Sequence, residues 1–186
     1  MDELIIINVY SKSELPSVIE FNNKFSYKLR IVSAMPINFG TVWKVPDSDK
    51  STVEWSRRFL RKFMDESYDV LIKIDPDTIV KTFPEIPCGC DVAGDFRKTN
   101  MGWVWFGGCQ YFTRNAIEKI LADDLFNGYC KYQDIQLAKS VQRLCLKAYN
   151  MNNIDAWNTI PSTAAVIHKG RCNIVKLDGG LITLTK

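Results

Sequence analysis

The sequence predicts an α/β fold in which helices cover both faces of a mixed, mainly parallel sheet. Two continuous apolar runs, Leu4 to Val9 and Asp69 to Ile74, are typical of strands that are buried on both faces. Segments with helical spacing of apolar residues, Ser13 to Phe25 and 51–65, alternate with these strands, and Leu29 to Ser33 is a further short strand. This alternation of strand and helix is typical of parallel sheets.

The second half of the chain alternates less regularly, and a long loop is expected before it at 35–49. No internal repeat, low-complexity segment or linker divides the 186 residues, so we expect a single domain at 1–186. The strands expected in the second half are 91–96, 103–106, 164–167, 173–177 and 181–184, and the helices are 113–125 and 132–149.

Composition indicates an ordinary globular protein, with 46% hydrophobic and 24% charged residues and a net charge of +3. No stretch is long enough for a membrane-spanning helix. The opening MDELIIINVY has no basic segment typical of a signal peptide, and the six cysteines show neither zinc spacing nor a C-x-x-C motif. We therefore expect a cytoplasmic protein whose cysteines are free thiols in the core.

Asp75-Pro76-Asp77 follows the second apolar run and is the feature richest in chemical information. Two carboxylates about 4 Å apart repel each other by about 4 kcal/mol at an effective dielectric constant of about 20, unless a cation lies beside them. Hard divalent cations such as Mg²⁺ and Mn²⁺ prefer oxygen ligands of this kind. The alternative is a strand end whose two acids point into solvent.

Three further features follow this acid pair. Gly107-Gly108 separates two apolar stretches, which indicates a β-bulge or bend and, compatibly with it, a close approach of a ligand to the backbone. Asp134 falls in the first turn of an expected helix, where the helix dipole alone favours an acid. His168, the only histidine, follows an apolar strand and is either a hydrogen-bonded strand end or a metal ligand.

In this order the four features resemble the metal-dependent glycosyltransferases of the GT-A fold, and most of all the Fringe-like enzymes. Those enzymes carry an acidic D-x-D, a glycine-pair passage, a later acid and a late histidine. The resemblance covers residues 4–170 and implies a GT-A-like, Rossmann-like α/β/α sandwich. It implies a nucleotide-binding half at about 1–80, an acceptor-binding and catalytic half at about 81–186, a UDP-linked sugar donor, and a glycan or other hydroxyl acceptor.

The resemblance also implies roles for individual residues. Asp77 would bind Mn²⁺ or Mg²⁺ together with His168, and Asp75 would contact the donor ribose or support the metal shell. Lys169 would neutralise the diphosphate, a task that Arg171 or Lys176 could perform instead. The metal would stabilise the negative charge that the leaving diphosphate gains.

Asp134 is implied as the general base that takes the proton of the acceptor hydroxyl in an inverting transfer. The family has two acids at this point, whereas this chain has Gln133-Asp134, so the stereochemistry is open. The glycine pair, Gly107 and Gly108, would let the donor sugar approach the backbone closely.

Three more residues are candidate sugar contacts. Asp95 is expected at a strand end, facing the site. Trp103 and Trp105 lie on one face of their strand, where they suit sugar stacking and core packing equally.

A second acidic pair, Asp123-Asp124, is expected at a solvated helix end.

Other functions fit parts of the same pattern. A phosphatase of the haloacid dehalogenase type would use Asp75 as nucleophile and Asp77 as general acid. A module that binds nucleotide sugars or glycans without turnover is a second alternative. Nucleic-acid binding is a third, and it rests on one helix face that is otherwise expected to be solvated, with Arg57, Arg58, Arg61 and Lys62.

Overall fold

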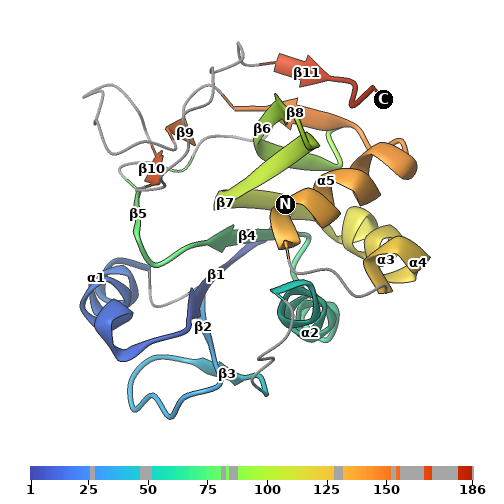
Figure 1. Cartoon of the computed structure of the whole chain (residues 1–186). Helices are drawn as coiled ribbons and strands as arrows, with labels where there is room; N and C mark the ends of the chain where they lie inside the picture. Colours follow the sequence, from blue (N-terminus) through green and yellow to red (C-terminus); the bar gives the residue numbers. More distant parts are fainter. Residues whose placement is uncertain are drawn as a thin grey trace.

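In the computed structural model, the described residues form a sheet of eight strands with a second sheet of three strands beside it (Figure 1). The strand order is β11-β8-β6-β7-β4-β1-β2-β3 in the large sheet and β5-β10-β9 in the small one. The structure describes residues 1–25, 28–46, 52–80, 83, 88–127, 132–151, 154–155, 166–168 and 180–185.

The bounds of the elements are as follows. The strands are β1 (Glu3–Val9), β2 (Leu29–Ser33), β3 (Val42–Lys44), β4 (Val70–Ile74), β5 (Thr78–Val80), β6 (Val92–Thr99), β7 (Gly102–Thr113), β8 (Ala148–Asn150), β9 (Ile154–Asp155), β10 (Val166–His168) and β11 (Gly180–Ile182). The helices are the 3-10 turn η1 (Lys12–Glu14), α1 (Leu15–Phe25), α2 (Thr52–Met64), α3 (Arg114–Ala122), α4 (Asp124–Asn127) and α5 (Gln133–Arg143).

The parallel part of the sheet is the part that the sequence describes best. β1 pairs in parallel with β2 and β4, and β2 pairs in parallel with β3, as the apolar runs predict. The other half is mixed, since β6 and β8 are parallel while β7 is antiparallel to both β4 and β6. The α/β class and the mixed, mainly parallel sheet are therefore confirmed.

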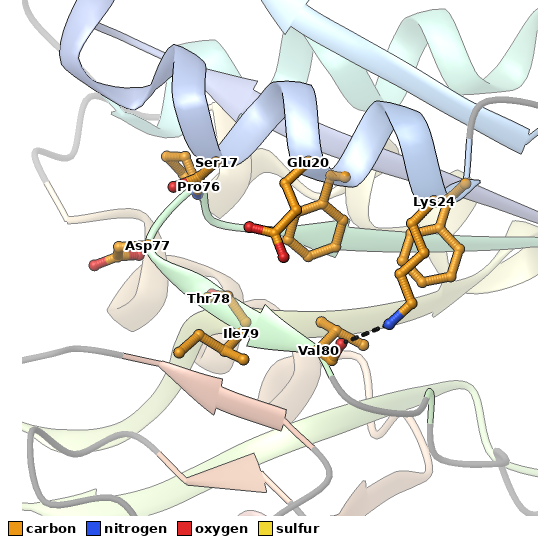
Figure 2. A pocket seen from close by; sticks show the side chains of 10 residues that line it. Ser17, Glu20, Lys24, Pro76, Asp77, Thr78, Ile79 and Val80 are labelled. Atoms are coloured by element: carbon orange, nitrogen blue, oxygen red, sulfur yellow. Dashed lines mark hydrogen bonds between the residues drawn. The ribbon is translucent and has the colours of Figure 1, made fainter.

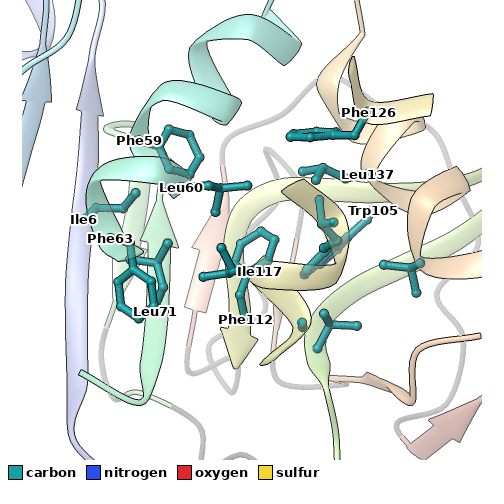
Figure 3. Packing of buried hydrophobic residues seen from close by; sticks show 14 of the residues in the cluster. Ile6, Phe59, Leu60, Phe63, Leu71, Trp105, Phe112, Ile117, Phe126 and Leu137 are labelled. Atoms are coloured by element: carbon teal, nitrogen blue, oxygen red, sulfur yellow. The ribbon is translucent and has the colours of Figure 1, made fainter. Parts of the chain in front are cut away.

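Helices cover the two faces of the sheet unequally (Figure 1). Helix α1 packs on one face, where Val18 and Phe21 join Ile5 and Ile7 in one core cluster. Helices α2 to α5 contribute to the other cluster, and Figure 3 shows side chains of α2 pointing toward the sheet and α3. The predicted apolar stripe of α2 is buried as expected: Trp55, Phe59, Leu60 and Phe63. Burying such a stripe is the main source of stability of an amphipathic helix.

Three expected elements are wrong in extent. The loop expected at 35–49 contains β3, which forms because the indole of Trp43 is buried beside β2. The helix expected at 113–125 is interrupted by the extended residue Asp123 and becomes α3 and α4. The helix expected at 132–149 ends at Arg143, because Cys145 adopts the left-handed conformation (φ 51°) that stops a helix, and Ala148 begins β8.

The hairpin of β6 and β7 is longer than the short strands expected at 91–96 and 103–106. Residues 97–99 pair with 102–104, so the chain turns at Asn100 and Met101. Gly102 has a φ of 95°, which a side chain would disfavour at this turn. The strand expected at 173–177 lies outside the described residues, and those expected at 164–167 and 181–184 correspond in their described parts to β10 and β11.

The cysteines follow the expected burial only in part. Cys90 and Cys109 are buried, and burial raises the pKa of the Cys109 thiol to about 12. Cys88 and Cys145 are exposed, contrary to the prediction of core thiols. Cys130 and Cys172 lie outside the described residues. In the part of the chain that the structure describes, none of the helices has the length and apolar character needed to span a bilayer.

Candidate functional site

Asp75-Pro76-Asp77 forms a tight turn at the carboxyl end of β4. The backbone N–H of Thr78 donates to the carbonyl of Asp75 over 3.0 Å, and Pro76 occupies the second position of this turn, where its fixed φ is favoured. The carbonyl of Gly108 accepts from the Asp75 N–H (3.3 Å) and from the Thr78 hydroxyl (2.9 Å). One hydrogen bond therefore closes the turn, and two fix it against β7.

The glycine pair forms part of a bulge, as one of the two interpretations predicts. The register of β6 with β7 shifts between Gly94 and Asp95, whose partners on β7 are Gln110 and Phe106, so residues 107–109 are extra. This bulge brings the carbonyl of the second glycine to the D-x-D turn. A close approach of a donor sugar to the same backbone stays a prediction.

Lys73 supplies a cation beside the first acid of the turn. Its ammonium forms an ion pair with the Asp75 carboxylate, and the two side chains are only 2% and 21% exposed. The expected repulsion between the two acids is therefore offset in part by a protein side chain, without a metal. The sequence carries a signal for this pair, since Lys73 interrupts an otherwise apolar strand.

A polar layer made of Lys73, Gln110 and Gln133 connects the D-x-D turn to helix α5. Gln110 of β7 lies opposite Lys73 in the strand register, and the Gln133 amide donates to the Gln110 side-chain carbonyl over 3.4 Å. All three residues are at most 7% exposed. Gln133 begins α5, so this layer positions the next residue, Asp134, which is half-buried.

The loop after β1 brings an aromatic ring to the same end of the sheet. Glu14 accepts hydrogen bonds from the backbone N–H groups of Tyr10 (2.7 Å) and Ser11 (3.1 Å), which fixes the entry to η1. The Tyr10 ring lies 5.2 Å from the Trp55 ring, and 48% of Tyr10 is exposed. Tyr10 is not among the residues predicted from the sequence, although an aromatic residue directly after the first strand is a usable signal.

Burial and several acids together influence the Tyr10 phenol. Its pKa is raised well above 10.0, first because the phenol hydroxyl is desolvated by the protein around it, then because the carboxylates of Asp75, Glu14 and Asp134 lie nearby. Asp75 and Asp134, predicted from separate motifs, therefore act electrostatically on one phenol.

His168 is brought to the other side of the D-x-D turn by strand pairing. β10 is antiparallel to β5, and His168 is the register partner of Thr78, the residue that follows Asp77. Paired Cα atoms of antiparallel strands are about 4.5–5.5 Å apart, so the backbone of His168 lies beside that of Thr78, one residue after Asp77. Figure 1 shows β10 next to β5. The side chain of His168 is not described, and Lys169 lies outside the described residues, together with Arg171 and Lys176.

The residues at this turn suit a divalent cation in chemistry. Asp77 is exposed, and Figure 2 shows its carboxylate pointing away from α1. A carboxylate together with an imidazole is a donor set that favours Mn²⁺ over Mg²⁺. Among the side chains that the structure describes, no group of three or more histidine, cysteine or acidic residues could hold a metal ion.

Asp95 does not face the site in the way that was predicted. It lies within β6, not at its end, and is only 3% exposed. Its carboxylate accepts two hydrogen bonds from Arg97, at 2.8 and 2.6 Å. A sugar contact by Asp95 is therefore wrong for this structure, because the carboxylate serves a buried ion pair.

The two tryptophans of β7 belong to the core. Trp105 is fully buried, with its ring 4.8 Å from that of Phe96, and it leaves no room for a Cβ on Gly94. Trp103 is half-buried against the same cluster, and its indole N–H donates to the carbonyl of Thr185 (2.9 Å). Of the two predicted roles, core packing is the one that Trp105 fulfils.

Two charged features also differ from expectation. Arg57 and Arg58 both pair with Glu54, so the basic face of α2 offers less charge to a phosphate than the sequence suggests. Asp123, expected in solvent, is 3% exposed and lies 3.3 Å from Arg143.

Comparison with known proteins finds no matching family model and no curated relative.

Replacing Lys73 tests the buried pair. We expect Lys73→Met to lower the free energy of unfolding by about 2–3 kcal/mol. This is less than the loss of about 3–5 kcal/mol that follows when one partner of a fully buried pair is removed, because Asp75 keeps some exposure. The double variant Lys73→Met/Asp75→Asn should recover part of this loss, since no buried charge is then left alone. Urea denaturation measures both values.

The control for these two variants is Lys28→Met. The ion pair of Lys28 with Glu3 is more exposed, so its loss should lower the free energy of unfolding by at most about 1 kcal/mol. An equal loss for Lys28→Met and Lys73→Met would show that the Lys73–Asp75 pair has no special weight in the fold.

Proposed function

We propose that this protein is a metal-dependent glycosyltransferase that moves a sugar from a nucleoside diphosphate donor, UDP-linked, to a hydroxyl acceptor. One observation carries the proposal: the D-x-D turn lies at the carboxyl end of a central parallel strand, with His168 paired beside it from the far end of the chain. Ligand sites of open α/β sheets lie at carboxyl ends of strands.

The residues of the turn divide into two proposed roles. Asp77, with its exposed carboxylate, and His168 would hold Mn²⁺ or Mg²⁺, which supplies charge stabilisation to a departing diphosphate. Asp75, held by Lys73, would contact the donor ribose. Tyr10, half exposed beside Asp75, offers an aromatic surface for the donor at the same edge.

Asp134 is the proposed general base. The acceptor hydroxyl attacks the anomeric carbon, the bond from that carbon to the diphosphate oxygen breaks, and the hydroxyl proton passes to the Asp134 carboxylate. The support for this role is position, since Gln133 of the polar layer begins α5 and Asp134 is the next residue of that helix.

Calorimetric titration with UDP tests the donor site. We expect binding in the presence of Mn²⁺, its loss in EDTA, and its loss in Asp77→Ala, because the carboxylate would no longer hold the cation. Asp124→Ala, which removes an exposed acid from α4, should bind UDP normally and is the matched control. Equal UDP binding with and without metal would contradict the proposal, and absence of UDP binding under both conditions would favour the phosphatase alternative.

Substitution of the proposed base tests the chemistry separately from binding. Asp134→Asn should bind UDP as the wild type does and transfer sugar at least about a hundredfold more slowly, which is the usual loss on removing a general base. Single-turnover transfer from radiolabelled donor measures the rate. A rate within a few-fold of the wild type would remove Asp134 from the reaction.

A further inference from the structure

A cavity of about 260 Å³ lies between helix α1 and the segment from Pro76 to Val80, beside the D-x-D turn. Pockets for drug-sized ligands measure about 300–1,000 Å³, so this cavity suits one small ring. Helix α1 belongs to the face of the sheet opposite α5, so the cavity is separate from the polar layer and Asp134.

The polar groups of the cavity come from one face of α1. Ser17, Glu20 and Lys24 follow at helical spacing, and Figure 2 shows Glu20 extending from the helix toward β5. Among the described residues, the Glu20 carboxylate has no hydrogen-bond or ion-pair partner. Lys24, in contrast, donates to the Val80 carbonyl over 3.3 Å and joins helix to strand at the far end.

The remaining wall of the cavity is apolar. The rings of Phe21 and Phe25 form its helix side, and Ile79 and Val80 form its strand side. Glu20 and Lys24 carry opposite charges, and the Asp77 carboxylate points out of the cavity (Figure 2). The charged groups inside the cavity therefore sum to zero. The lining therefore suits a neutral ligand with one apolar face and several hydroxyl groups.

From these features we propose that the α1–β5 cavity binds one sugar ring of an extended acceptor, a ring other than the one whose hydroxyl attacks the donor, because Asp134 lies on the other face of the sheet. The ring hydroxyls would donate to the Glu20 carboxylate, a charge-assisted hydrogen bond, while the C–H face of the ring packs on the phenylalanine rings. The inference rests on the proposed function, because the cavity is lined in part by Asp77, the residue whose outward-pointing carboxylate is the proposed metal ligand.

The test is ligand-observed NMR with methyl glycosides of glucose, galactose, mannose and N-acetylglucosamine. At least one should bind the wild type, and Glu20→Ala should weaken its affinity about tenfold or more, the usual effect of losing a hydrogen bond to a charged group. Glu118→Ala, which removes an exposed helical glutamate outside the cavity, should leave the affinity unchanged. Both variants should keep the wild-type melting temperature.

The other outcomes are decisive as well. Failure of all four glycosides to bind, or equal binding to Glu20→Ala, would overturn the proposal. Displacement of the glycoside by UDP with Mn²⁺ would also overturn it, because the cavity would then belong to the donor site. Normal UDP binding without glycoside binding rejects this cavity alone, whereas glycoside binding that depends on Glu20 without UDP binding rejects the proposed transferase and keeps the sugar site.

Discussion

The buried ion pair between Lys73 and Asp75 is the interaction on which the rest of the site depends. Burying a charged carboxylate at the end of a strand costs free energy, and the neighbouring ammonium offsets that cost. The Asp75 side chain nevertheless stays partly exposed to solvent. The same Lys73 lies opposite Gln110, which accepts a hydrogen bond from Gln133 at the start of α5. One buried charge therefore links the D-x-D turn to the helix that carries the proposed base.

A second constraint acts on the outer side of the turn. The short strand β5 begins directly after Asp77 and pairs with β10, which ends at His168. The hydrogen bonds from Asp75 and Thr78 to the Gly108 carbonyl hold the turn against β7. The D-x-D segment is thus fixed by two distant parts of the chain, β7 and β10, which is the pre-organisation that a binding site needs.

The sequence predicts best what depends on local pattern. The predictions of β1, β4 and the apolar stripe of α2 are correct, because the spacing of apolar residues shows directly which side chains are buried. The expected loop at 35–49 was wrong because β3 forms by pairing with β2. The expected end of α5 was wrong because the left-handed conformation of Cys145 is not visible in the spacing of apolar residues. The position expected for Asp95 was wrong for a different reason: β6 continues past Asp95, so Arg97, two residues later on the same strand, can pair with its carboxylate.

The central claim is that Asp77 and His168 meet at one metal ion. His168 is the only histidine in the chain, so its imidazole protons can be followed by NMR without ambiguity. With UDP present, a small amount of Mn²⁺ should broaden these signals strongly, and Asp77→Ala should abolish the broadening. Sharp His168 signals at concentrations where UDP and Mn²⁺ are bound would contradict the claim.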